Sequence, residues 1–175
     1  MCSNLQKDRH TIKEESPCSQ ELTDAAKDWI AIDGLWFQAV EKAYGMDVAV
    51  TMDCKVWEQF AAIEAERIKK RLGLPKAGGL DALDAALSAR LVHNVNAFTI
   101  SRPDEKTLVF SINGCRVQSA RERKGLEIFA CLPVGMIEFA VFARTIDPQI
   151  TTECISCLPE TKPGVQYCKW KFTLE

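Results

Sequence analysis

The fold of this chain is decided between residues 131 and 157, where the sequence is CLPVGMIEFAVFARTIDPQITTECISC. Pro133 and Gly135 stand at the head of a run of apolar residues at helical spacing, which predicts a helix that begins there. We expect this helix to end near Asp147, because a residue that precedes proline resists the right-handed helical conformation. Residues 150–156 then predict a strand that ends in a pair of cysteines. The stretch therefore predicts a helix followed by a strand.

Three amphipathic helices are predicted ahead of this unit, because apolar residues recur there at a spacing of three to four. The first begins at Thr23, its expected N-cap, and ends before Gly45. The second covers about residues 47–72, and the third covers about residues 79–93. The remaining elements expected are strands at residues 94–101, at 107–116 with an extension that could reach Ala120, and at 166–173.

These elements place the chain in the α+β class, with N-terminal helices followed by a ββαββ antiparallel sheet and the helices packed on one face. Residues 1–20 are polar and lack periodicity, which predicts a flexible tail. The helical part is expected at residues 21–93, and the cysteine-containing sheet part at 94–175. In a chain of 175 residues, we expect these two parts to form one domain over residues 21–175.

The charge balance argues against two classes of partner. The 22 lysines and arginines nearly match the 24 aspartates and glutamates, so we expect neither a nucleic acid nor an anionic membrane as partner. Residues 1–17 carry charges and no apolar segment, which argues against a secretory signal peptide. The longest apolar run, residues 128–143, contains Glu138 and is too short to span a bilayer. The sequence thus predicts a cytoplasmic protein.

Eight cysteines are the unusual feature of the composition. Antiparallel pairing of the last two strands would bring Cys154, Cys157 and Cys168 to one end of the sheet, and Cys131 stands just ahead of the helix. Four thiolates can hold a zinc ion in a closed tetrahedral site, and the same four can hold an iron–sulfur cluster. Free buried thiols are the alternative, since a buried cysteine is an ordinary small hydrophobic residue.

The order of these cysteines resembles a known family. A cysteine leaves a strand (Cys115), another precedes a glycine-containing helix start (Cys131), a pair ends the next strand (Cys154 and Cys157), and the last strand begins Cys-Lys-Trp-Lys-Phe at Cys168. On this pattern, residues 106–174 resemble the vinyl-4-reductase family, the small-ligand-binding domain of bacterial regulators. They also resemble the related L-2-amino-thiazoline-4-carboxylate hydrolase-like family.

The resemblance implies a zinc ion, a buried hydrophobic ligand and a homodimer. In the vinyl-4-reductase sensors, three cysteines and one glutamate hold the zinc. Cys131, Cys157 and Cys168 match the three thiolate ligands by position, whereas Cys154 stands where the glutamate is expected and Glu153 is adjacent. The expected metal ligands are therefore the four cysteines 131, 154, 157 and 168, with zinc as the ion and an iron–sulfur cluster as the alternative.

A pocket for a small, largely apolar ligand is expected between the N-terminal helices and the sheet. The residues expected to line it are Trp36, Phe37, Trp57, Phe110 and Phe139, with Arg116 or His93 as a polar anchor. The competing interpretation places these aromatic side chains in the packing between helices. His93 is expected at the surface, where its protonated ring would interact favourably with the end of the third helix.

Three functions are compatible with these features. We expect a metal-stabilised, sensor-like domain that binds a small molecule in an apolar pocket. The alternatives are a hydrolase of the thiazoline-carboxylate type, with Cys115 as nucleophile and His93 as base, and an iron–sulfur redox protein. The binding domain is favoured because a closed four-thiolate site leaves no open position for water.

Overall fold

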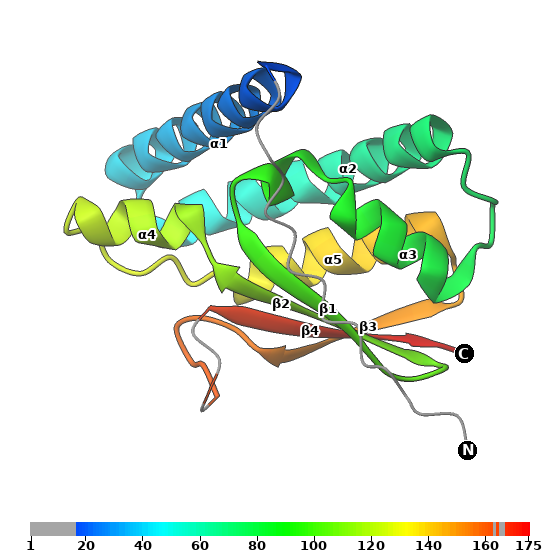
Figure 1. Cartoon of the computed structure of the whole chain (residues 1–175). Helices are drawn as coiled ribbons and strands as arrows, with labels where there is room; N and C mark the ends of the chain where they lie inside the picture. Colours follow the sequence, from blue (N-terminus) through cyan, green and yellow to red (C-terminus); the bar gives the residue numbers. More distant parts are fainter. Residues whose placement is uncertain (1–16, 163, 165–166) are drawn as a thin grey trace.

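A computed structural model describes residues 17–162, 164 and 167–175 of the chain (Figure 1). Two long helices come first, and the strands follow in two pairs that are separated by helices. The helices are α1 (Pro17–Tyr44), α2 (Met46–Leu72), α3 (Gly79–Ser88), α4 (Arg116–Arg123) and α5 (Leu132–Ile146), with a 3-10 helix η1 (Leu91–Asn94). The strands are β1 (Ala97–Asp104), β2 (Thr107–Gly114), β3 (Ile150–Ser156) and β4 (Cys168–Leu174). The fold class is α+β, as predicted.

The four strands form one antiparallel sheet in the order β1-β2-β4-β3. The last strand of the chain, β4, lies between β2 and β3 and pairs with both. Helices α2, α3 and α5 lie over one face of the sheet, and α1 packs outside α2 (Figure 1). Because the final strand is central, the sheet can form only when both halves of the chain are in place. None of the helices in the described part of the chain is both long and apolar enough to cross a bilayer.

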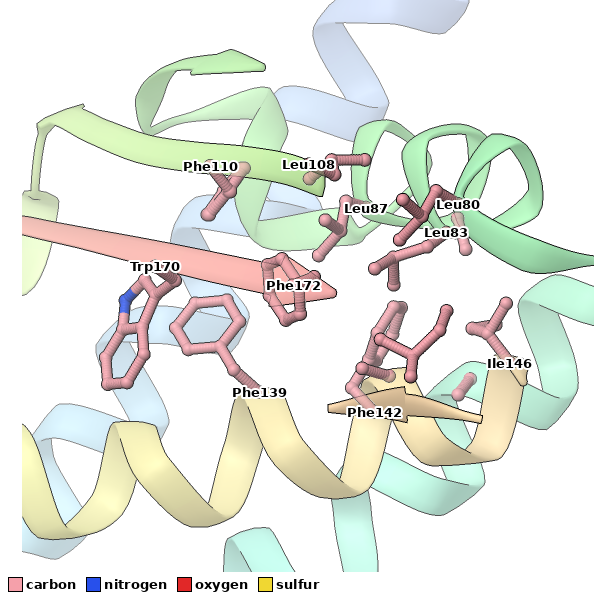
Figure 2. Packing of buried hydrophobic residues seen from close by; sticks show 14 of the residues in the cluster. Leu80, Leu83, Leu87, Leu108, Phe110, Phe139, Phe142, Ile146, Trp170 and Phe172 are labelled. Carbon is pink, nitrogen blue, oxygen red and sulfur yellow. The ribbon is translucent and has the colours of Figure 1, made fainter. Parts of the chain in front are cut away.

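The core lies between this face of the sheet and the helices above it (Figure 2). Its largest fully buried side chains include Phe110 of β2, Trp170 of β4 and Phe142 of α5. The ring of Phe139 on α5 packs 4.8 Å from Trp170 and 5.6 Å from Phe110, measured between centroids. Burial of aromatic side chains on this scale is a main source of stability for a fold of this size.

Helix α5 approaches the sheet closely because Gly135 carries no side chain. A Cβ atom at this position would lie 2.6 Å from the ring of Trp170, well inside van der Waals contact. The contact joins the first turn of α5 to β4. It therefore holds Cys131, at the start of α5, beside the end of the sheet where Cys168 begins β4.

Most elements lie where the sequence predicts them, but the ends of two helices differ, and the first strand covers Ala97–Asp104 rather than residues 94–101. Helix α1 begins at Pro17 rather than at Thr23, whose hydroxyl donates to the carbonyl of Ser19 inside the helix and caps nothing. Residues 17–20 of the expected tail are therefore helical, and residues 1–16 lie outside the described part of the chain. The third predicted helix ends at Ser88, and η1 follows as a separate turn.

Residues 116–123 form helix α4, so the expected extension of the second strand to Ala120 is wrong. The backbone N–H of Arg116 donates to Asn96 Oδ1 at 2.9 Å, which satisfies one of the free donors at the helix start. Further along α4, Arg121 makes a two-pronged contact with Glu41 of α1, at 2.7 and 2.8 Å. Both contacts are tertiary, and a local pattern cannot reveal them.

Candidate functional site

Four cysteines gather at one end of the sheet, and we call them the thiol cluster. Cys131 is the N-cap residue of α5, Cys154 lies in β3, Cys157 directly follows β3, and Cys168 is the first residue of β4. The start of α5, the end of β3 and the start of β4 lie at the same end of the sheet (Figure 1). The juxtaposition predicted from the strand order is therefore present.

Cys157 is the centre of the thiol cluster. Its side chain is 5 % exposed, and its Sγ lies 3.4 Å from Cys131 Sγ. The thiol of Cys157 also interacts with those of Cys168 and Cys154. At the rim, Gln118 Nε2 points at Cys131 Sγ from 3.8 Å. Three segments that are distant in sequence thus direct their sulfur atoms toward one point.

Burial and the neighbouring sulfur atoms favour the protonated form of Cys131, Cys154 and Cys157. The contact with Cys131 lowers the pKa of Cys157, but the hydrogen bond with Cys168 and burial outweigh it and raise the pKa to about 12. The hydrogen bond to Cys157, together with burial, raises the pKa of Cys131, and burial raises the pKa of Cys154. A thiolate is costly here unless a cation compensates its charge.

The donor set suits a thiophilic metal ion. In a tetrahedral site with Zn–S bonds near 2.3 Å, neighbouring sulfur atoms lie roughly 3.8 Å apart. The observed separation of 3.4 Å between Cys131 and Cys157 is close to that value. Within the described ranges, however, no group of three or more His, Cys, Asp or Glu side chains already has the arrangement of a metal site. The four sulfur atoms are near one another but would have to shift to surround an ion.

Glu153, the adjacent candidate ligand, lies apart from the thiol cluster. Its carboxylate forms an ion pair with Lys171, its cross-strand partner on β4, and its side chain is 62 % exposed. Successive residues of a strand point to opposite faces, so Glu153 and Cys154 face different sides of the sheet. The Glu153 carboxylate is therefore not placed to share an ion with the thiol cluster.

A hollow of about 410 Å³, open to solvent, adjoins the thiol cluster. Cys154 and Cys157 form part of its wall, while Cys131 and Cys168 do not. The other lining residues are mostly apolar: Ala130, Leu132, Pro133, Ile155, Ser156, Leu158, Pro159 and Glu160. Its volume lies in the range of small-molecule sites. We refer to it below as the thiol hollow.

The residues expected to line an internal pocket do not come together. Trp36 is 68 % exposed on α1, whereas Phe37 packs against Phe129 with ring centroids 4.8 Å apart. Trp57 packs edge-on against its neighbours on α1 and α2. Phe110 and Phe139 do meet, but inside the packed core. None of these five, and neither Arg116 nor His93, lines the thiol hollow.

His93 is partly buried rather than exposed at the surface. Its ring packs between Phe98 and Phe110, with centroids 4.7 and 5.0 Å away, and its Nδ1 bonds to the carbonyl of Leu87. Burial, together with the positive charge of Arg90, lowers the pKa of His93 to about 3. The expectation of a protonated surface cap is therefore wrong, and so weakly basic a ring is a poor general base.

Cys115, the candidate nucleophile, stands at the N-cap of α4. A helix N-terminus favours a thiolate, yet burial outweighs this and raises the pKa of the Cys115 thiol. Among the described residues, no hydrogen bond joins Cys115 to His93. This pair therefore lacks the activated geometry that a cysteine–histidine hydrolase needs.

A second cluster, which the sequence reasoning missed, lies between α1, α2 and α5. Arg90 is fully buried, and its guanidinium contacts Glu64 at 2.9 Å and Glu138 at 2.7 Å. Asp53 of α2 and Asp33 of α1 add two more carboxyls close enough to interact with Glu138. We call these five residues the polar centre. The one signal for it in the sequence is Glu138, a lone charge within an apolar run.

The polar centre contains four carboxyl groups and one guanidinium group. Burial is the main cause that raises the pKa of Asp53 to about 7, and the negative charges of Asp33 and Glu138 add to it. Burial likewise raises the pKa of Asp33 and of Glu138, although Arg90 opposes the shift in Glu138. The guanidinium of Arg90 also lies over the ring of Phe142, 4.9 Å from its centroid. The single positive charge of Arg90 thus compensates only part of the negative charge that the four carboxyl groups can carry.

No curated protein sequence matches this chain. A family model matches residues 12–174, a range that includes the thiol cluster, the thiol hollow and the polar centre. The match extends from ahead of α1 to the last residue of β4. This chain therefore belongs to the family of unknown function DUF6125.

Proposed function

We propose that this chain is a metal-stabilised domain that binds a small, largely apolar molecule. The observation that carries the proposal is the gathering of four thiols around Cys157, with Cys131 Sγ only 3.4 Å away. Zinc is the ion that fits this donor set best, because four thiolates form a closed tetrahedral site around it. An iron–sulfur cluster uses the same donors and is the alternative that the experiment below separates.

The role of the ion follows from where its ligands stand. Cys131, Cys154 and Cys168 belong to three elements, α5, β3 and β4, which meet only in the folded chain. A metal that binds such a site contributes its binding free energy to folding. The ion would then join the start of α5 to the end of the sheet and stiffen the wall beside it.

The ligand site in this proposal is the thiol hollow rather than an internal pocket. The hollow has room for a small molecule, and six of its lining residues are apolar. Two cysteines of the thiol cluster form part of its wall, so occupation of the hollow and occupation of the metal site would affect each other. Such coupling is what a sensor of a small molecule requires.

Metal analysis of the purified full chain tests the proposal. We expect one zinc ion per chain, no absorption in the visible range, and a melting temperature that falls when a chelator removes the ion. Visible absorption together with iron and sulfide would instead show a cluster. Cys157→Ser should lose the metal, whereas the control Cys54→Ser, a partly buried cysteine of α2, should keep it. A chain that contains no metal and is not stabilised by added Zn²⁺ would refute the proposal.

A further inference from the structure

We propose that the outer face of α1 and α2 binds a second copy of this chain, with the two α1 helices antiparallel across a two-fold axis. The inference goes beyond the proposed function and is independent of it. It concerns a surface that contains neither the thiol cluster nor the thiol hollow, and it needs no metal ion.

Large apolar side chains are exposed along both helices. On α1 they are Leu22, Ile32, Leu35 and Trp36. On α2 they are Val48, Met52, Val56 and Ile63. We call these two sets together the helical face. Exposed apolar residues that are scattered singly are ordinary, whereas residues that gather on one face mark an interaction site.

The spacing on α1 is that of a helix that packs against another helix. Apolar residues recur at alternating intervals of three and four, at Leu22, Ala25, Trp29, Ile32, Trp36 and Ala39. This is the heptad pattern of a seam between two helices. Trp29 packs on Trp57 and Phe60 of α2, but Ile32 and Trp36 remain exposed in the described part of the chain. Most of the seam is therefore open to a further helix.

The two parts of the helical face adjoin each other. The ring of Trp29, in the α1 series, packs on that of Phe60 with centroids 5.5 Å apart. Phe60 lies between Val56 and Ile63 on the surface of α2, because residues three and four apart are neighbours on a helix. The face is therefore continuous across the contact between α1 and α2, which run antiparallel (Figure 1).

The area of the helical face matches what a stable dimer needs. Its eight side chains are each 37–68 % exposed, and at about 150–250 Å² for each large side chain they present on the order of 800 Å². The largest apolar patch on a typical monomer is roughly 300–600 Å². A standard protein interface buries about 800 Å² on each partner. A second copy of the face can thus cover the first completely.

The charges of α1 favour a second copy over a membrane. The helix carries five acidic and two basic residues, whereas helices that lie on a membrane surface are rich in lysine and arginine. Glu21, Asp24 and Asp28 stand in the first half of α1, and Lys42 stands in its last turn. An antiparallel pair brings the acidic half of each helix toward Lys42 of the other, whereas a parallel pair would place acid beside acid.

The middle of the helical face indicates where the two copies cross. Ile32 stands near the centre of the α1 series. Trp29 is level with Trp57 and Phe60, so in this antiparallel pair of helices Ile32 is level with Val56, near the centre of the α2 set. One two-fold axis near these two residues pairs α1 with α1 and α2 with α2. Such an interface uses the same patch on both chains, so it closes at a dimer.

Sedimentation velocity of the full chain under reducing conditions tests the surface. We expect a dimer, and Ile32→Glu should raise its dissociation constant about 100-fold or more, because each dimer would bury the charge twice. Ile128→Glu makes the same change at a matched position, 55 % exposed against 54 % for Ile32, and should leave the dimer intact. Unchanged far-UV circular dichroism shows that both variants fold. A wild type that stays monomeric up to about 100 μM, including one that binds phosphatidylserine vesicles instead, would overturn the inference, as would equal effects of the two variants.

Disulfide trapping tests the antiparallel arrangement. Two copies of residue 32 face each other near the axis, so Ile32→Cys should form a disulfide between chains under mild oxidation. Two copies of residue 25 would lie roughly 20 Å apart, so Ala25→Cys, on the same seam, should not. Peptide mass mapping distinguishes these disulfides from any that the native cysteines form. A disulfide between two copies of residue 25 and none at residue 32 would overturn the arrangement.

Discussion

The polar centre predicts that the free energy of unfolding depends on pH through Asp53. The substitution Asp53→Asn tests this. The pKa of Asp53 is raised from 3.8 to about 7, chiefly by burial and further by the charges of Asp33 and Glu138. The folded chain therefore binds more protons than the unfolded chain between about pH 4 and pH 7. The contribution of Asp53 to the free energy of unfolding is therefore greatest below this window, falls as the pH rises through the folded-state pKa, and levels off about one pH unit above it. Asparagine cannot ionise, so the variant lacks this loss.

The size of the effect follows from the same pKa. With a folded-state value of about 7, the contribution of Asp53 to the free energy of unfolding decreases by about 1.4 kcal/mol between pH 6 and pH 8. Asp33 and Glu138 shift in the same direction and add to the fall in the wild type, but they remain in the variant. The difference between variant and wild type therefore reports the titration of Asp53 together with its coupling to Asp33 and Glu138.

Urea unfolding followed by circular dichroism measures this difference. Asp53→Asn should become more stable relative to the wild type as the pH rises, by about 1.4 kcal/mol between pH 6 and pH 8. Asp28→Asn, which removes an exposed carboxylate of α1, is the matched control and should show no such trend. Any titration of the thiol cluster is common to all three proteins and cancels. A difference between Asp53→Asn and wild type that stays constant over this range would refute the account of the polar centre.

Three further experiments test other parts of the fold and site. Arg90→Met leaves two buried carboxylates without their counter-charge and should lower the free energy of unfolding by about 3–5 kcal/mol at pH 7.5, measured in urea; an effect under 1 kcal/mol would contradict the ion-pair geometry. Gly135→Ala should cost about 1–3 kcal/mol, because the added Cβ meets the ring of Trp170, whereas Gly34→Ala should be neutral or stabilising in the open part of α1. Chelator treatment should lower the melting temperature of the wild type and leave that of Cys157→Ser unchanged; equal shifts would mean that the chelator acts elsewhere.

Sequence signals within a few residues are sufficient to predict the fold between residues 131 and 157. Proline and glycine mark the start of α5, the Asp147-Pro148 step marks its end, and residues 150–156 form β3 as predicted. These signals act within a few residues of where they stand, so the pattern alone reveals them. The strand order then suffices to group Cys154, Cys157 and Cys168, because antiparallel neighbours bring specified residues together.

Helix α4 and the burial of His93 could not be predicted from nearby sequence. The sequence of α4 is polar and has no apolar stripe that favours a helix over a strand, and its start is completed by Asn96, 20 residues away. Arg121 reaches Glu41, 80 residues away, and its side chain is buried. His93 sits at the end of a helical pattern, but the aromatic rings of β1 and β2 cover it.

What the sequence alone determined is the α+β class, the extent of α2, α5 and β3, and the neighbourhood of the four cysteines, because each depends on periodicity, breakers or strand order. What only the tertiary structure decided is the thiol hollow and the polar centre. The hollow lies between residues 130–133 and 154–160, and its shape depends on how these two stretches pack, which no local sequence pattern encodes. Arg90, Glu64 and Glu138 come from three elements that meet only in the folded chain, and their pairing depends on burial that no single segment provides.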